Sequence, residues 1–107
     1  MTDYLLVLTT VPNEKAAAEI SRQLVEARLA ACVTVSNACQ SLYWWENNII
    51  QDQEFMLFIK SKKSLWPLLE KKLQEIHPYS VPEILAFSVE TGLAKYLDWL
   101  EKETRQG

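Results

Sequence analysis

The stretch ACVTVSNACQSLYWWENNIIQDQEFMLFIKS, residues 31–61, decides the fold. Two runs rich in β-branched and aromatic residues flank the tripeptide ENN. Because asparagine tolerates the positive φ angles of a tight turn, Asn47 and Asn48 predict the turn of one long β-hairpin. Its arms, residues 31–45 and 49–61, are about 45 Å long at about 3.3 Å per residue, whereas an eight-residue strand spans about 26 Å. The hairpin is therefore expected to extend beyond the rest of its sheet.

The segments on either side of the hairpin alternate between strand and helix patterns. A buried-strand pattern, DYLLVLTTV, ends at Pro12, and Asn13 is placed to cap the helix that follows. Beyond the hairpin, apolar residues recur every three or four positions, interrupted by one more short β-type run. The patterns predict strands at residues 3–11 and 82–90 and helices at residues 13–30, 64–76 and 93–103.

This order of elements predicts an α+β fold. Strand, helix, two strands, helix and strand make the βαββαβ arrangement of the ferredoxin-like split βαβ fold, here with an added C-terminal helix. We expect a single domain over residues 1–107, with a four-stranded antiparallel sheet and helices on one face. The other face of such a sheet is uncovered, and the strand EFMLFIK is apolar at consecutive positions, so a second layer is needed. Another subunit could supply it.

Composition narrows the range of functions. The formal net charge of -3 and a pI near 5.1 provide no basic surface for a phosphate backbone, so no nucleic-acid partner is expected. The sequence has no leader pattern and no apolar run of about 20 residues, so we expect no membrane partner and a cytoplasmic location. Cys32 and Cys39 match neither a CxxC pair nor a zinc knuckle, so both are predicted to be free packing residues.

The stretch HPYSVPEI, residues 77–84, gathers the only histidine with a tyrosine and a glutamate. Its two prolines favour a turn between a helix and a strand. His77, Tyr79 and Glu83 are also groups that ligate ions or move protons at neutral pH, so a turn, a ligand site and a catalytic site remain alternatives. His77 is the candidate metal ligand. A single imidazole predicts weak binding of copper or another divalent cation, and this helix-end side chain is expected to contribute little to the core.

Two further groups are candidates for the lining of a cleft. Lys60 follows the apolar run FMLFI and could face Glu83, although a solvated lysine at a strand end fits the same pattern. Trp45 could stack against a ligand. The aromatic run Tyr43, Trp44 and Trp45 is also typical of residues that anchor an interface at the end of a hairpin.

Five segments, in the same order, resemble the CutA family of divalent-cation-tolerance proteins. They are EARLAACV (26–33), SLYWWENNI (41–49), FIKS (58–61), HPYSVPEI (77–84) and YLDWL (96–100). The resemblance implies a homotrimer of ferredoxin-like subunits, with sheets packed face to face and long hairpins that reach neighbouring subunits, as in the PII signalling trimers. It also implies a role in tolerance of, or response to, copper and other divalent metal ions, without an agreed enzymatic reaction.

The chain departs from the metal-linked pattern of that family at two positions. Some relatives have a cysteine where this chain has Thr9 and a second histidine where it has Ile76. We therefore expect a homotrimer that requires no cofactor and binds a metal ion or small ligand in clefts between subunits. The expected lining residues are His77, Tyr79, Glu83, Lys60 and Trp45.

Two other functions are alternatives to this one. A PII-like signalling or scaffold trimer with vestigial metal sites fits the loss of soft ligands. An acylphosphatase-like hydrolase would need an anion cradle of backbone amides beside an arginine, and the segment TTVPNEK has neither glycine nor arginine. We therefore expect no enzymatic activity.

Overall fold

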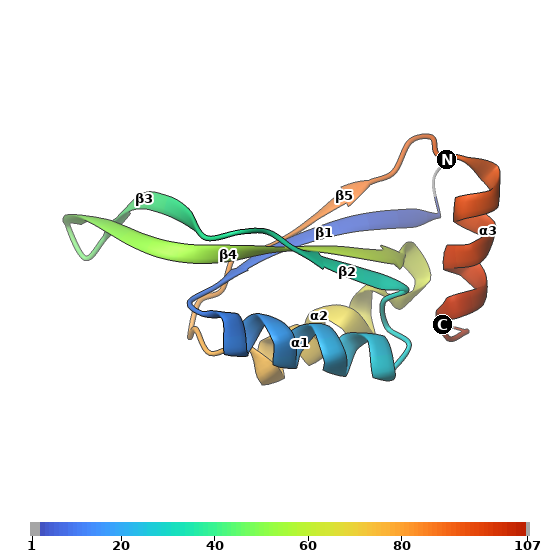
Figure 1. Ribbon diagram of the computed structural model, residues 1–107, viewed down its shortest axis with the longest axis horizontal. Coiled ribbons are helices and arrows are strands. Elements are labelled where there is room, and N and C mark those ends of the chain that lie inside the picture. The colour runs from blue at the N-terminus through green and yellow to red at the C-terminus, as the bar shows by residue number, and fades with distance from the viewer. Residues whose placement is uncertain (1–2, 107) are drawn as a thin grey trace.

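A computed structural model describes residues 3–106. Its five strands form one sheet, and three helices accompany it (Figure 1). The elements are strand β1 (Tyr4–Val11), helix α1 (Glu14–Glu26), strands β2 (Cys32–Val35), β3 (Cys39–Trp45) and β4 (Asn48–Lys62), the 3₁₀ turn η1 (Lys63–Leu65), helix α2 (Trp66–Ile76), strand β5 (Ile84–Ser88) and helix α3 (Ala94–Glu103). All pairings are antiparallel. The predicted α+β class and antiparallel sheet are confirmed, with five strands in place of four.

Strand β4 is the longest strand and connects the two parts of the sheet. Its C-terminal half pairs with β1 on one side, from Phe55 to Lys62, and with β2 on the other, which gives the order β2-β4-β1-β5. Its N-terminal part pairs with β3 alone among the described strands and projects past the helices as a two-stranded arm (Figure 1). The predicted long hairpin, which extends beyond the rest of the sheet, is therefore present.

The first arm of the hairpin differs from the prediction of one continuous strand. It consists of β2 and β3, separated by Ser36–Ala38. Val35 pairs with Leu57 and Cys39 pairs with Glu54, so three residues of this arm face two residues of β4. The extra residue is a β-bulge, which bends the strand and increases its twist.

Ser36 keeps the hydrogen-bond ladder closed across this bulge. Its backbone amide donates to the Met56 carbonyl oxygen at 2.9 Å, and the Met56 amide donates to Ser36 Oγ at 2.9 Å. A side-chain hydroxyl therefore replaces one backbone acceptor. Hydrophobic periodicity does not report such a replacement, which is why the sequence pattern predicted an unbroken strand.

The hairpin turns at Glu46 and Asn47, one residue earlier than predicted. Both residues have positive φ angles, 50° and 66°, and they connect the paired residues Trp45 and Asn48. A two-residue loop with both residues in the left-handed region is a type I′ turn, whose twist matches the flanking strands. Asn48 is instead the first residue of β4, and its side-chain amide donates to the Glu46 carbonyl oxygen at 3.2 Å.

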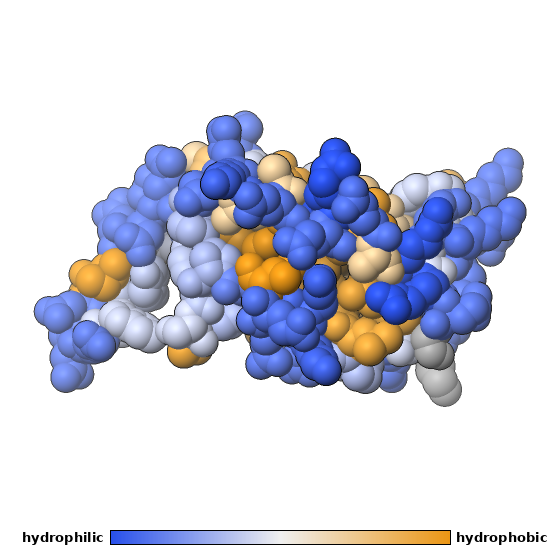
Figure 2. All heavy atoms as spheres, turned by 90° about the horizontal axis from the view of Figure 1, so that it is seen from below, coloured by the Kyte–Doolittle hydropathy of each residue, from blue (hydrophilic) through white to orange (hydrophobic). Residues whose placement is uncertain are grey.

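The core lies between one face of the sheet and helices α1 and α2. A strand presents every second side chain to the same face, so alternate residues of β1 and β4 point toward the helices. The side chains buried there, each no more than 2% exposed, are Val7, Val11, Leu57, Ile59, Ile20, Leu24, Leu69 and Leu73. As predicted, Asn13 caps α1, and its Oδ1 accepts from the Ala16 amide at 2.8 Å. Figure 2 shows the outside of this helical layer, which is mostly hydrophilic with apolar side chains gathered near its middle.

The other face of the sheet carries apolar side chains that are only partly covered. We call it the open face and define it by Leu6, Leu8, Met56, Phe58, Leu85 and Phe87. Leu85 and Phe87, on the edge strand β5, are both 49% exposed. Helix α3 lies at one end of the sheet, where the Lys62 ammonium donates to Glu101 at 2.7 Å. Within residues 3–106, no helix is long and apolar enough to cross a membrane.

Replacing Glu46 with glycine is expected to stabilise the hairpin. Glycine adopts a positive φ without the penalty of about 1 kcal/mol that a side chain incurs there, so the free energy of unfolding should rise by about 0.5–1 kcal/mol. Urea unfolding at a fixed protein concentration measures the change. Asn48→Gly is the matched control, because Asn48 is paired in β4, and it should lower stability instead. Equal effects of the two substitutions would contradict the turn described here.

Candidate functional site

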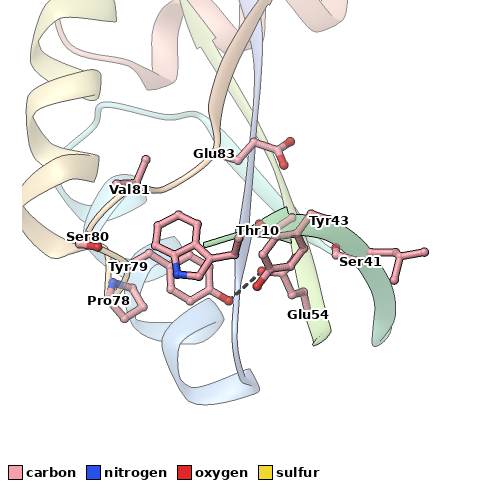
Figure 3. A pocket seen from close by; sticks show the side chains of 11 residues that line it. Thr10, Ser41, Tyr43, Glu54, Pro78, Tyr79, Ser80, Val81 and Glu83 are labelled. Atoms are coloured by element: carbon pink, nitrogen blue, oxygen red, sulfur yellow. Dashed lines mark hydrogen bonds between the residues drawn. The ribbon is translucent and has the colours of Figure 1, made fainter. Parts of the chain in front are cut away.

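A hollow of about 680 Å³ opens between the hairpin and the loop that joins α2 to β5 (Figure 3). We call it the hairpin hollow. Its lining residues are Thr10, Ser41, Leu42, Tyr43, Trp45, Glu54, Pro78, Tyr79, Ser80, Val81 and Glu83. The structure therefore brings together Trp45, Tyr79 and Glu83, three of the residues predicted to line a cleft. Lys60 and His77 do not line this hollow.

A hydrogen bond between Tyr79 and Glu54 joins two walls of the hairpin hollow. The Tyr79 hydroxyl donates to Glu54 Oε2 at 2.7 Å, as the dashed line in Figure 3 shows. Burial, followed by this contact with the carboxylate, raises the pKa of Tyr79 well above its usual value. Tyr79 therefore keeps its proton at neutral pH and remains a donor. Glu54 lies on β4 and is only 6% exposed, so this carboxylate is held in a largely desolvated position.

His77 lies directly behind Tyr79 and is buried, with 8% of its surface exposed. Its Nδ1 accepts from the Tyr79 amide at 3.1 Å, and its Nε2 lies 2.9 Å from the Thr10 carbonyl oxygen and 3.0 Å from Thr9 Oγ1. A nitrogen that accepts from a backbone amide carries no proton, so we assign the proton to Nε2, which donates to the Thr10 carbonyl. Both ring nitrogens are thus engaged in hydrogen bonds.

This environment makes His77 a neutral residue of the core. Burial lowers its pKa, and the hydrogen bond to the Thr10 carbonyl offsets that effect only in part. The expectation that a helix-end side chain contributes little to the core is therefore wrong for His77. Its hydrogen bonds hold the loop after α2 against the end of β1, which fixes the position of Tyr79. A metal ion at His77 would have to break one of these hydrogen bonds, so a copper ligand at this residue stays a prediction.

Lys60 and Glu83 do not form the predicted pair within this chain. Lys60 Nζ donates to Thr34 Oγ1 and lies 3.7 Å from Cys32 Sγ. The register explains the separation. Lys60 pairs opposite Leu6, whereas Glu83 precedes Ile84, the partner of Thr9, and so falls beside Thr10, four positions along β1 and about 13 Å away. Glu83 is exposed at the rim of the hairpin hollow and lies apart from the Tyr79–Glu54 contact (Figure 3).

The aromatic run at the end of the hairpin is divided between the two faces of β3. Tyr43 and Trp45 both line the hairpin hollow, because they are two positions apart on one face. Trp44 points the other way and is 71% exposed, opposite Ile49. The Tyr43 hydroxyl donates to Asp52 on the neighbouring strand, and this hydrogen bond is the main cause of the raised pKa of Tyr43. The predicted interface role of the three residues stays a prediction.

Two important carboxylates are not predicted by the sequence pattern. Glu54 precedes the apolar run FMLFI, where it reads as a polar residue outside the core, and only the pairing with Cys39 places it beside β3. Glu101 forms an ion pair with Lys62, the last residue of β4. Lys62 is buried, with 4% of its surface exposed. No group of three or more His, Cys, Asp or Glu side chains that could hold a metal ion occurs in residues 3–106.

The chain resembles known proteins along nearly its whole length. The family model of the CutA1 divalent ion tolerance protein matches residues 5–103. The divalent-cation tolerance protein CutA of Thermus thermophilus is 42% identical over 92% of this chain and 96% of its own length. The crystal structure of CutA1 from Oryza sativa superposes with a TM-score of 0.96 at 36% identity, covering 99% of this chain and 97% of that one. CutA1 from Shewanella sp. SIB1 gives a TM-score of 0.95 at 38% identity, covering 98% of each.

Some relatives are considerably longer than this chain. Protein CutA of Homo sapiens is 44% identical over 89% of this chain, which corresponds to 53% of the human protein. The chloroplastic protein CutA 1 of Oryza sativa is 37% identical over 95% of this chain and 58% of its own length. The similarity therefore covers about half of these plant and mammalian proteins.

Removing the imidazole should change how stability depends on pH. Because the pKa of His77 is lower in the folded than in the unfolded chain, the unfolded chain takes up the proton first as the pH falls below about 6.5. The native protein should then lose stability, by at most about 1.4 kcal/mol per pH unit, until the folded pKa is reached. Urea unfolding at pH 7.5 and 5.5 measures this loss. The His77→Gln variant, which retains an amide donor, should lose less unfolding free energy than the parent between pH 7.5 and pH 5.5. An identical loss in the two proteins would contradict the description of His77 as a buried, neutral imidazole.

Removing the Tyr79 hydroxyl should destabilise the protein. Tyr79→Phe leaves the buried Glu54 carboxylate without its donor, which should lower the free energy of unfolding by about 1–3 kcal/mol. Tyr96→Phe is the matched control, because the Tyr96 hydroxyl makes no hydrogen bond with another described residue, and its effect should be small. Chemical denaturation of both variants at pH 7 makes the comparison. A Tyr79→Phe variant as stable as Tyr96→Phe would show that the contact contributes little.

Proposed function

The chain belongs to the CutA1 divalent ion tolerance protein family, and from that premise we propose that it acts in the tolerance of divalent cations, copper among them, as a cytoplasmic homotrimer. In this proposal the hairpin hollow is a ligand site that a neighbouring subunit helps to enclose. The protein has no catalytic role in the proposal. The observation that carries it is the combination of a partly exposed apolar sheet face with a projecting hairpin.

The open face supports an assembly of several subunits. Leu85 and Phe87 are each about half exposed, although they belong to a sheet of which the other face is packed against helices. Such apolar patches on otherwise polar proteins mark interaction surfaces, and a sheet buries its second face when another layer packs on it. A second copy of this chain would supply that layer in the manner that the family resemblance implies.

The hairpin supports the same assembly. Trp44 and Ile49 form a cross-strand pair that is exposed to 71% and 59%, and Leu42 beside them is 69% exposed. A two-stranded arm is marginally stable in water unless it packs against further structure. A ring of copies gives every arm the same acceptor surface, because cyclic symmetry repeats one contact. Three copies is the number that the CutA resemblance implies.

The residues around His77 support weak rather than tight metal binding. Thr9, which occupies the position where some relatives have cysteine, lies 3.0 Å from His77 Nε2. A cysteine at this position would place a thiolate beside the imidazole and give the metal two protein ligands, whereas the Thr9 hydroxyl is a weaker ligand. This contact also favours a second candidate function, a PII-like signalling or scaffold trimer in which the metal site is vestigial.

The proposed assembly predicts a mass of about three chains. Sedimentation equilibrium at micromolar concentration should give about three times the chain mass of 12.4 kDa. Trp44→Ala should weaken the assembly and lower the melting temperature together, because it removes the exposed aromatic side of the arm. Leu68→Ala on the outside of α2, 45% exposed, is the control and should change neither quantity. A stable, folded monomer would refute the proposed trimer.

Restoring a thiol beside His77 should strengthen metal binding. Calorimetric titration with copper and with zinc, with phosphate as a control ligand, should give weak binding for the parent protein. Thr9→Cys should raise the affinity for zinc by about tenfold or more, because thiolate and imidazole are both good zinc ligands. Thr91→Cys is the control, since Thr91 is exposed between β5 and α3 and does not line the hairpin hollow.

Two results would speak against this view of the metal. If Thr9→Cys and Thr91→Cys bind zinc equally, the position beside His77 has no special role. If His77→Ala binds copper as tightly as the parent, the metal lies elsewhere in the assembly. A parent protein with no measurable affinity for either metal would favour the scaffold function instead.

A further inference from the structure

The hairpin hollow has an unusual combination of lining groups. Three aromatic side chains, Tyr43, Trp45 and Tyr79, share it with the carboxylates of Glu54 and Glu83. Neither lysine nor arginine is among the lining residues. Aromatic faces are electron-rich and attract cations, and carboxylates do so directly. The lining therefore favours a positively charged occupant and disfavours an anion.

Glu54 is the group in the hollow that most requires such an occupant. Only 6% of the surface of Glu54 is exposed, and a carboxylate in that position needs hydrogen bonds or a counter-charge. Oε2 accepts from Tyr79, a neutral donor, whereas Oε1 receives no hydrogen bond from the described residues and is not fully buried, so it remains accessible to a ligand. The ion pairs within residues 3–106 join Arg22 to Glu26, Arg28 to Glu103 and Lys62 to Glu101. Glu54 thus lacks a cationic partner among the residues that the structure describes.

The chemistry of the lining distinguishes an organic cation from a metal ion. A hard divalent ion needs about six oxygen ligands, and the described residues bring no three metal-ligating side chains together. The two carboxylates of the hollow also lie apart (Figure 3). An ammonium or guanidinium group, in contrast, needs one carboxylate oxygen and an aromatic face. The volume of about 680 Å³ leaves room for an aliphatic body of several carbons.

We infer that the hairpin hollow binds an organic cation, an alkylammonium or guanidinium group, which donates to Glu54 and lies against the rings of Trp45 and Tyr43. The inference specifies the ligand class of the site under the proposed function and rests on it. Two sources have the same chemistry. One is a free amine, and the other is the lysine or arginine side chain of a second copy of this chain.

Titration with simple cations tests the inference. The probes are n-butylammonium, tetramethylammonium and n-butylguanidinium, with butyrate and Mg²⁺ as controls for the anion and the metal ion. Calorimetry and the indole N–H resonance of Trp45 report binding, and sedimentation is measured in parallel. We expect saturable binding of the organic cations and of neither control. Glu54→Gln and Trp45→Leu should each weaken it by about tenfold or more, because each removes one of the two interactions.

Matched controls separate the site from the general charge of the protein. Glu90→Gln and Trp99→Leu remove an exposed carboxylate and a partly exposed indole elsewhere, and both should bind as the parent does. Glu83→Gln, at the exposed rim, provides a second charge variant if Glu54→Gln does not fold, and it should weaken binding by a smaller factor. Equal losses in the site and control variants, or no saturable binding of any organic cation and no effect of Glu54→Gln on assembly, would overturn the inference.

The same measurements identify the source of the cation. Binding that leaves the sedimenting mass unchanged indicates a free amine. If the amines dissociate the assembly, or Glu54→Gln alone does so, the cation is a side chain of the second copy. A trimer that binds copper but takes up no organic cation, and whose assembly is unaffected by Glu54→Gln, refutes this inference and leaves the proposed function in place. A monomer that binds the amines refutes the trimer and not the ligand class.

Discussion

The structure depends on the backbone hydrogen bonding of strand β4, whose 15 residues pair with three other strands. Where β1 and β2 flank it, both of its edges are satisfied and its side chains reach the core on one face and the open face on the other. N-terminal to Phe55, β3 is its one partner among the described strands, and here β4 becomes one side of a projecting arm. The hairpin hollow lies at this transition. Its residues are held by the sheet on one side and by the loop after α2 on the other.

Much of this arrangement could be predicted from the sequence. The long hairpin, the two core helices and the antiparallel sheet all follow from side-chain periodicity and turn residues, because those patterns report burial directly. The bulge at Ser36 and the turn at Glu46 could not, since both depend on single hydrogen bonds or backbone angles that tolerate many residue types. The position of the long hairpin was therefore correct, whereas the details of its ladder were not.

The candidate site was predictable only in part, for a related reason. Tyr79 and Glu83 were found because they belong to one short stretch with unusual composition. Glu54 and His77 acquire their roles from contacts distant in the sequence: Glu54 accepts from a residue 25 positions away, and His77 bonds to residues 67 and 68 positions away. Lys60, the predicted partner of Glu83, lies too far from it along the sheet. The pairing register of β4 and β5 against β1 shows this separation, and hydrophobic periodicity does not specify that register. Lys62, two positions later, is the lysine that enters the interior and binds Glu101 of α3.

The bulge at Ser36–Ala38 also changes which residues of the first hairpin arm share a face. On β2, even-numbered residues share a face with Lys60, Phe58 and Met56, but after the extra residue it is the odd-numbered residues of β3, Tyr43 and Trp45 included, that continue this face. In evolutionary terms, the loss of one codon from residues 36–38 would leave two residues facing two, and the pairs Val35–Leu57 and Cys39–Glu54 would both be kept. Tyr43 and Trp45 would still face the hollow, because the turn at Glu46 and Asn47 and the pairing with β4 fix their orientation. A descendant without the bulge would therefore keep the same fold and the same ligand-facing residues.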